Sequence, residues 1–218
     1  MICQEQIIHS ICNALYRALA DDAFYIQLEE KITASGRDGR EGMLHYYDYS
    51  IQTAKATGRL VLPHDQGDWG AALWSLPSQA TDKQSKPEVI TNTEAYSDAV
   101  NQNNKTAYFV EHLGQSAYEH YQAVCDSMAK LTKPFITDKD WYLSIIGIAP
   151  EYQSQGLGKQ LLSPVLSESD KVGVSTYLET FVPRNKRFYE RYGFKTITKL
   201  FEPELGTHYH ILRRPVGG

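Results

Sequence analysis

The sequence has little cysteine, no long apolar run and no large excess of charge of either sign. Its three cysteines, Cys3, Cys12 and Cys125, are an odd number whose spacing fits no zinc motif, so we expect reduced thiols and no bound metal. No apolar run approaches the ~20 residues that a membrane-spanning helix needs, so we expect no membrane association. A net charge of −4 gives no electrostatic reason to bind nucleic acid or anionic lipid.

The N-terminal segment and the overall composition indicate a cytoplasmic protein with one domain. Residues 1–20 lack a basic start and carry polar side chains throughout, which argues against a signal peptide. The 218 residues are 42% hydrophobic and 22% charged, which suits a single globular domain over 1–218. Whether this domain is a monomer or a homodimer stays open.

Apolar spacing predicts two helices and a hairpin in the first third of the chain. An amphipathic helix is predicted over residues 4–20, followed by a turn at Asp21–Asp22, and a second helix over about 41–56. The apolar residues that define the first helix are Ile7, Ile8, Ile11, Leu15 and Leu19. Short apolar runs at 58–62 and 69–76, joined by a turn, predict the two strands of a hairpin.

A polar stretch interrupts this pattern. Residues 78–106 are rich in Ser, Thr, Asn, Gln and Lys and have no clear period, which predicts a long loop or insertion with a short helix around 93–101. Ser116 and Glu119 have the spacing of a capping box, which predicts the start of a helix that continues to about Leu131.

The C-terminal third alternates between strands and helices. Strands are predicted over 141–149, 174–181, 194–201 and 208–213, and helices over about 157–171 and 184–192, the second of which ends at Gly193. This strand–helix–strand–helix–strand–strand order predicts an α/β (α+β) fold with a mixed sheet.

The segment between the first of these strands and the helix after it predicts a phosphate-binding turn. It reads Gln153-Ser-Gln-Gly156-Leu-Gly158-Lys159. The backbone N–H groups of such a turn, together with the positive end of the helix dipole, suit a pyrophosphate. A dinucleotide motif would need a third glycine after Gly158, and a P-loop would need a glycine at the position of Gln153, so neither motif fits.

Two runs of the sequence carry a family resemblance. The pattern Gln153-x-x-Gly156-x-Gly158 after an apolar strand resembles the coenzyme A pyrophosphate loop of the GNAT acetyltransferase superfamily. The run Pro183-Arg-Asn-Lys-Arg-Phe-Tyr-Glu-Arg-Tyr-Gly-Phe194 is similar to that family's second signature, with an Asn and a Tyr on a short helix that ends in Gly-Phe. The resemblance is strong over about 141–195, the expected cofactor-binding core. Within the family, this sequence looks most like the branch that contains puromycin N-acetyltransferase.

The resemblance implies a fold. We expect a GNAT-like mixed, mostly antiparallel central sheet with helices on both faces and with strands that splay apart at the coenzyme A site. The family normally opens with a strand before its first helix. This chain begins almost directly with the helix over 4–20, so the presence of that strand stays open.

The resemblance also implies which residues hold acetyl-CoA as co-substrate, with no metal. The backbone of Ile146, Gly147 and Ile148 would pair with the pantetheine arm and polarise the thioester carbonyl. The loop residues around the pyrophosphate would be Gln153, Ser154, Gln155, Gly156, Leu157, Gly158 and Lys159. Lys159 would add a positive charge beside the pyrophosphate, or would only be a solvent-exposed lysine in the first turn of the helix. Asn185, Phe188 and Tyr189 would contact the cofactor from the short helix.

Three further residues have two interpretations each. Tyr189, four residues after Asn185 and so on the same helix face, would protonate the departing thiolate as a general acid, or would be a packed aromatic. Glu179 would take the amine's proton, directly or through water, and would contact the substrate, or would only make a structural hydrogen bond. Trp74 would lie near the acceptor pocket or in the core.

The resulting functional hypothesis is an N-acetyltransferase. It would move the acetyl group of acetyl-CoA to a primary amine of a small molecule by direct attack in a ternary complex. A protein N-terminus or lysine as acceptor is one alternative. An acyl-CoA-binding module without turnover is another.

Overall fold

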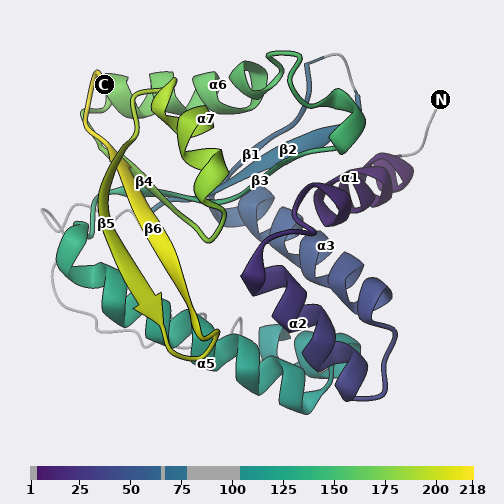
Figure 1. The fold of residues 1–218 in the computed structure, drawn as a ribbon. Coiled ribbons are helices and arrows are strands. Elements are labelled where there is room, and N and C mark those ends of the chain that lie inside the picture. The colour runs from purple at the N-terminus through teal and green to yellow at the C-terminus, as the bar shows by residue number, and fades with distance from the viewer. Residues whose placement is uncertain (1–3, 65–66, 78–103) are drawn as a thin grey trace, which may run out of the picture.

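The computed structural model describes residues 4–64, 67–77 and 104–218, and a six-stranded sheet lies at its centre (Figure 1). The strand order is β1-β2-β3-β4-β6-β5. Every neighbouring pair is antiparallel except β3 and β4, which are parallel. The strands are β1 (Arg59–Val61), β2 (Gly70–Ser75), β3 (Trp141–Ile148), β4 (Thr176–Thr180), β5 (Lys195–Glu202) and β6 (Thr207–Arg214).

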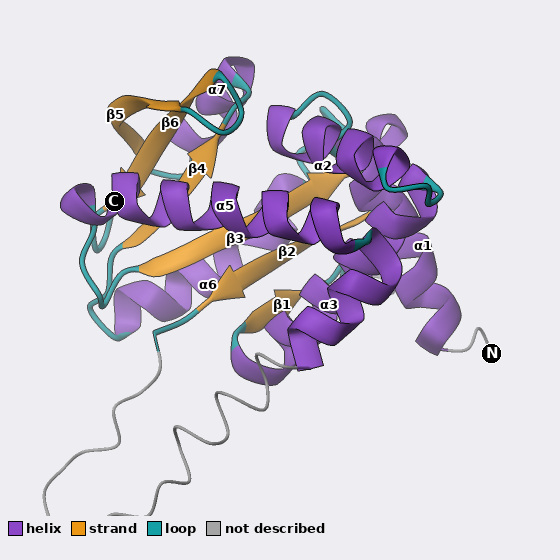
Figure 2. Cartoon of the chain, turned by 90° about the horizontal axis from the view of Figure 1, so that it is seen from below, coloured by secondary structure: helices purple, strands orange, loops and turns teal. Residues whose placement is uncertain are grey.

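Helices cover both faces of this sheet, as Figures 1 and 2 show. One face carries α1 (Gln4–Ala18), α2 (Ala23–Ala34), α3 (Gly39–Thr57), a helix over residues 104–113 and α5 (Gln115–Thr132). The other face carries α6 (Gly158–Lys171) and α7 (Lys186–Glu190). Short 3₁₀ turns lie at η1 (Lys133–Phe135), η2 (Pro150–Tyr152) and η3 (Pro183–Asn185). The expected mixed, mostly antiparallel sheet with helices on both faces is therefore confirmed.

Two large apolar clusters hold these layers together. On the first face, Ile11 and Leu15 of α1 are fully buried against α2, α3 and the sheet, as the helical spacing of apolar residues in α1 predicts. On the second face, Leu161 and Leu162 of α6 pack with Phe194 and Leu178. Of the described helices, none has the length and apolar character that crossing a membrane requires.

The sheet opens between its two parallel strands. β3 pairs with β4 only through Trp141–Leu143, which lie opposite Thr176–Leu178. Beyond that point β3 stays paired with β2 as far as Ile148, while β4 stays paired with β6. The register of β2 on β3 shifts between Leu73 and Trp74, so that β3 carries a bulge where the two parallel strands separate. The predicted splay is thus present as a V-shaped gap.

The end of α1 lies across the mouth of this gap. Arg17 forms an ion pair of 2.6 Å with Glu151, which follows β3, and Asp21 pairs with Arg184, which follows β4. Gly147 lets the helix approach β3, because a Cβ at this position would lie 2.8 Å from Leu15 Cδ2 and 3.0 Å from the Ala18 Cβ. Exposed ion pairs contribute little stability, so this close packing is the main link between α1 and the gap.

Two helices were not predicted, and one predicted cap is wrong. Nothing in the sequence interpretation assigned a helix to α2 or to residues 104–113, although Asp22 caps α2 by accepting a hydrogen bond from the Phe24 N–H at 3.0 Å. The proposed loop over 78–106 is corrected for its last three residues, which are helical. The helix proposed around 93–101 lies outside the described residues.

The capping box at Ser116 and Glu119 is also corrected. The N-cap of the helix is two residues earlier, at Gly114 with a φ of 92°, and no side chain caps the helix. Glu119 instead accepts a hydrogen bond of 2.7 Å from the Gln115 side chain. Within the described residues no strand precedes α1. The family's opening strand is therefore not seen there.

The packing at Gly147 predicts the effect of a side chain there. Gly147→Val should lower the free energy of unfolding by about 1–3 kcal/mol, because the added methyl groups displace α1 from β3. Urea denaturation measures the change. Leu15→Ala in the same chain removes the clashing methyl groups, so the double variant should lose less than the sum of the two single losses. Strict additivity of the two losses would contradict this account.

Candidate functional site

The turn between β3 and α6 presents a row of free backbone donors. Ser154 has a φ of 61° and Gly156 a φ of 78°, while Leu157 returns to right-handed helical angles. Such alternation turns successive N–H groups toward one side of the chain. Within the described residues, no hydrogen-bond acceptor meets the N–H groups of residues 154–158. These donors lie at the positive end of the α6 dipole, so together they form a site for an anion.

Side chains of the same turn hold its shape. The Gln153 amide donates to the carbonyl of Ile148 at 2.8 Å, and the Gln155 amide donates to the carbonyl of Glu151 at 2.9 Å. These contacts give both glutamines a positioning role. Gly156 has open space where a Cβ would be, so its positive φ, rather than crowding, is what makes a glycine favourable there.

Gly158 brings the two sequence signatures together. A Cβ at Gly158 would lie 2.4 Å from Cε2 of Phe188, so only a glycine lets the first turn of α6 approach α7 this closely. The Phe188 side chain packs against this point and remains half-buried. The loop that carries the free donors and α7, which carries Tyr189 and follows Asn185 of η3, are therefore direct neighbours.

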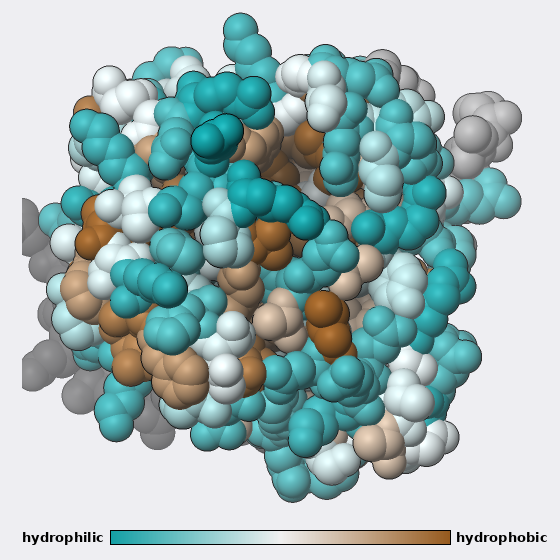
Figure 3. Space-filling model, viewed as in Figure 1, coloured by the Kyte–Doolittle hydropathy of each residue, from teal (hydrophilic) through white to brown (hydrophobic). Residues whose placement is uncertain are grey.

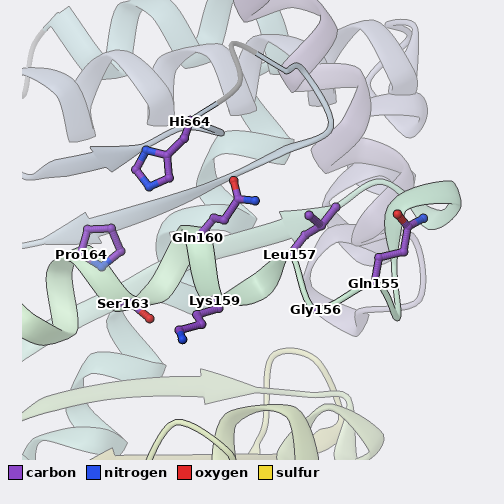
Figure 4. A pocket seen from close by; sticks show the side chains of 8 residues that line it. All are labelled: His64, Gln155, Gly156, Leu157, Lys159, Gln160, Ser163 and Pro164. Atoms are coloured by element: carbon purple, nitrogen blue, oxygen red, sulfur yellow. The ribbon is translucent and has the colours of Figure 1, made fainter.

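A pocket of 580 Å³ lies along the first two turns of α6 (Figure 4). Its walls are His64, Gln155, Gly156, Leu157, Lys159, Gln160, Ser163 and Pro164. Figure 4 shows Gln160 on the same side of the helix as His64, with Lys159 on the opposite side. The Oε1 atom of Gln160 is buried without a hydrogen-bond partner in the described structure. Lys159 is exposed, so its cation can reach the loop only across solvent.

The gap between β3 and β4 exposes backbone groups of the predicted pantetheine strand. The Gly147 carbonyl points toward β2, because a Cβ added to Gly70 of β2 would lie only 2.2 Å from the Gly147 oxygen. The Ala149 N–H points the same way and donates to the Trp69 carbonyl at 2.8 Å. In a strand, successive residues direct their N–H and C=O groups to opposite sides. Ile146 and Ile148 therefore direct theirs into the gap. One of these groups, the Ile148 carbonyl, is already occupied by Gln153.

The gap is visible on the molecular surface. The space-filling view of Figure 3 shows apolar side chains at the floor of a recess, with polar residues around its rim. In the matching ribbon view this recess lies between α1, α7 and the loop that precedes α6. The three predicted cofactor segments thus border one hollow.

Asn185 and Tyr189 both lie beside this gap with unused polar groups. Tyr189 is 7% exposed, and its hydroxyl makes no hydrogen bond to the residues that the structure describes. Burial, followed by the charge of Asp22, raises the pKa of Tyr189, so the hydroxyl keeps its proton at neutral pH. The Asn185 side chain is half-buried and caps nothing. Both groups are free to contact a ligand.

Glu179 lies on the other face of β4, toward α5. One carboxylate oxygen accepts a hydrogen bond from Thr132, and the other accepts one of 3.0 Å from Tyr142. Burial raises the pKa of Glu179 despite both bonds. The structural hydrogen bond that the sequence offered as one alternative accounts for both oxygens. The role of general base stays a prediction.

Trp74 is not brought together with Glu179. It is fully buried in the cluster under α6, and its indole nitrogen has no hydrogen-bond partner in the described residues. Core packing therefore accounts for its position, and the predicted substrate contact has no structural support. The described residues also contain no group of three or more His, Cys, Asp or Glu side chains placed to hold a metal.

Asp22 has an environment that the sequence interpretation missed. It was assigned only to a turn, yet its carboxylate is among the charges that raise the pKa of Tyr189. Burial raises the pKa of Asp22 itself to about 6. The available signal was the position of Asp22 as an N-cap before a helix. That position alone does not reveal an interaction with Tyr189, which is far away in the sequence.

Comparison with known proteins agrees with this geometry. Residues 118–196 match the family model described as acetyltransferase (GNAT) domain. A structure from Corynebacterium glutamicum, described as a histone acetyltransferase and related acetyltransferase, superposes with a TM-score of 0.62 at 16% identity, over 100% of this chain and 96% of that one. Arylalkylamine N-acetyltransferase 2 from Aedes aegypti gives a TM-score of 0.58 at 15% identity, over 100% and 98%.

A third similar structure is the polyamine N-acetyltransferase of Drosophila melanogaster. It superposes with a TM-score of 0.51 at 10% identity, over 78% of this chain and 80% of that one. At these identities the likeness shows the fold, which is that of GNAT acetyltransferases. The matched segment 118–196 contains the donor loop, β4 and α7, and so covers the border of the gap.

The environment of Glu179 predicts a pH-dependent stability difference. Its raised folded-state pKa means that its contribution to stability is complete below the unfolded pKa of about 4.3 and is lost as the pH rises through the folded value. Glu179→Gln removes this titration. Denaturation in urea between pH 4 and pH 8 should therefore show the variant gaining stability relative to wild type as the pH rises. A constant offset at every pH would contradict the assigned environment.

Proposed function

We propose that this protein transfers the acetyl group of acetyl-CoA to a primary amine of a small molecule, by direct attack within a ternary complex. The observation that supports this most strongly is the row of free N–H groups over residues 154–158 at the start of α6, next to the open end of β3. The match of 118–196 to the acetyltransferase domain supports the same assignment. Two of the three similar structures are named for arylalkylamines and polyamines and one for histones, so a small amine is the acceptor we propose and a protein amine is the alternative.

The proposed roles follow from the groups that the gap leaves unused. The donors of residues 154–158 would hold the pyrophosphate, and the backbone of Ile146 and Ile148 would pair with the pantetheine arm. Asn185 would bind that arm from the end of η3, directly before α7. The exposed N–H groups of β3 would stabilise negative charge on the thioester oxygen during attack. Positioning and charge stabilisation together supply most of the catalysis in such a site.

Tyr189 is the proposed general acid. In the reaction the amine nitrogen bonds to the carbonyl carbon, the carbon–sulfur bond breaks, and the departing sulfur receives a proton. A buried phenol that keeps its proton and makes no protein hydrogen bond can supply it. We further propose that 1–218 form one domain with 141–195 as the cofactor-binding core. The resemblance to the puromycin branch is carried by motif residues alone and remains part of this proposal.

The first test is calorimetric titration of the protein with acetyl-CoA. We expect binding of acetyl-CoA and of desulfo-CoA, because both carry the pantetheine arm as well as the pyrophosphate. We expect no binding of NAD, which has a pyrophosphate but no such arm. Free thiol release with a panel of amines then tests turnover. Acetyl-CoA binding without transfer would favour the acyl-CoA-binding module, and no binding at all would remove the proposed function.

Gly156→Val should abolish measurable acetyl-CoA binding. A β-branched residue is strongly disfavoured at a φ of 78°, so the loop would lose the conformation that aligns its donors. Gly173→Val is the matched control, because Gly173 has a φ of 71° and open space around its Cβ position but lies beyond the other end of α6. Both variants should lose similar stability. Equal loss of binding in both would contradict a specific role for the loop.

Tyr189→Phe should lower kcat about 100-fold, the lower end of the usual range for a lost general acid, with little change in the Kd for acetyl-CoA. Steady-state kinetics and calorimetry measure the two quantities separately. Tyr192→Phe provides a neighbouring control that leaves Tyr189 in place. If Tyr189→Phe turns over at the wild-type rate, Tyr189 is a packed aromatic only.

A further inference from the structure

A second pocket lies between α1 and α3, apart from the gap between β3 and β4. Its volume is 650 Å³, and its walls come from residues 8–12 of α1 and 41–55 of α3. It shares no lining residue with the pocket beside α6. On α1, the contact with the gap begins only at Leu15, which packs on Gly147. The proposed acetyl transfer leaves this second pocket without a role.

The base of this pocket is apolar and carries one buried thiol. Ile8 and Leu44 are half-buried and pack on the core beneath them. Cys12 lines the same pocket with 2% of its surface exposed, and no described side chain bonds to its sulfur. Burial, followed by the charge of Asp48, raises the pKa of Cys12 to about 12. The thiol therefore keeps its proton and can donate a hydrogen bond to a ligand.

Aromatic contacts hold one wall of the pocket in place. The Nδ1 atom of His45 lies 3.1 Å from the Tyr108 hydroxyl, and the His45 ring stacks on His112 with the two ring centroids 3.7 Å apart. Tyr108 and His112 belong to the helix over residues 104–113. A second helix thus fixes the His45 ring before a ligand arrives, which lowers the entropy that binding would lose by ordering it.

The charged side chains of the pocket are sorted along α3. Glu41 and Asp48 lie at one end and Lys55 at the other. No ion pair of the described residues includes any of the three, and Asp48 accepts one long hydrogen bond of 3.3 Å from Gln52. Seven residues make about two turns, so Asp48 and Lys55 share a side of the helix about 10 Å apart. At this separation they do not pair with each other, and each is open to a ligand.

We propose that this pocket binds a linear zwitterion, with an ammonium group at one end and a carboxylate at the other, such as a short peptide or an ω-amino acid. The ammonium group pairs with Asp48 and Glu41, and the carboxylate pairs with Lys55. Gln52 lies between them and can bond a peptide group, while the apolar base takes the carbon chain. With a hydrogen bond of about 2.8 Å at each end, a ligand whose charges lie roughly 5–10 Å apart spans the two ends.

The charges of the pocket argue against other small ligands. A diamine of this length would place one ammonium group beside Lys55, and a dicarboxylate would place one carboxylate beside Asp48, so either ligand would meet a like charge. The described residues contain no group of three or more His, Cys, Asp or Glu side chains placed to hold a metal. A ligand with one charge of each sign satisfies both ends.

The test is a methyl NMR titration with 6-aminohexanoate as the probe. In protein labelled with ¹³C at the isoleucine methyl groups, the Ile8 signal reports on the pocket and the Ile148 signal on the gap between β3 and β4. The variants Ile8→Val and Ile148→Val assign the two signals. We expect 6-aminohexanoate to shift the Ile8 signal to saturation and to leave the Ile148 signal in place. Hexylamine and hexanoate, which each lack one charge, should bind about threefold to fivefold more weakly, as expected for a charge pair that water partly reaches.

Two variants test the ends of the pocket separately. Asp48→Asn should weaken the binding of 6-aminohexanoate and hexylamine about threefold to fivefold but not that of hexanoate. Lys55→Met should weaken 6-aminohexanoate and hexanoate by a similar factor but not hexylamine, and Lys55 is exposed, so the fold is preserved. Asp126→Asn and Lys130→Met are the matched controls, because they remove the same charges from exposed positions on α5. Neither control should change the affinity for any of the three probes.

Three results would each overturn the proposal. An Ile8 signal that none of the probes shifts would mean that the pocket binds no zwitterion. A shift of the Ile148 signal alone would place the probe in the gap between β3 and β4. Equal affinities for the three probes would mean that the pocket takes only the carbon chain. Because no measurement uses acetyl-CoA, each of these results is independent of the proposed function.

Discussion

The site depends on the separation of two parallel strands. β3 and β4 are hydrogen-bonded for three residue pairs and then part. Unpaired backbone groups inside a protein are costly, so a strand edge that opens this way must be held open by stronger pairing elsewhere. The longer ladders of β2 with β3 and of β4 with β6 provide it. Apart from the Ile148 carbonyl, which accepts a hydrogen bond from Gln153, the N–H and C=O groups of β3 that face the gap are thereby left for a ligand.

Four segments far apart in the chain meet around this gap. The donor loop follows β3, α7 follows β4, and Gly158 lets the loop and α7 touch through Phe188. The turn at the end of α1 closes the mouth, with Arg17 and Asp21 paired to opposite sides. Each contact is modest by itself. Their combined effect is to hold the free N–H groups of the loop and the helix that carries Tyr189 on the border of one gap.

Environment, rather than residue type, separates the two acidic candidates. Glu179 and Asp22 both have a raised pKa, and burial is the main cause in each. The hydroxyl groups of Thr132 and Tyr142 occupy Glu179, which makes it part of the wall between β4 and α5. Asp22 instead caps α2, where it accepts a hydrogen bond from the Phe24 N–H.

The sequence by itself determined the elements with strong local signals. Helical spacing defined α1 and α6, the Gly193 turn ended the short helix before β5, and Gln153-x-x-Gly156-x-Gly158 located the donor loop. Local signals did not reveal the helices at α2 and at residues 104–113. They also predicted Ser116 as the N-cap of α5, whereas the N-cap is Gly114. Tertiary structure alone decided the place of Asp22, the packing of Trp74 and the bonds of Glu179. The physical reason is that burial, charge coupling and strand separation depend on segments that meet only after the chain has folded, whereas helical period and turn chemistry act between near neighbours.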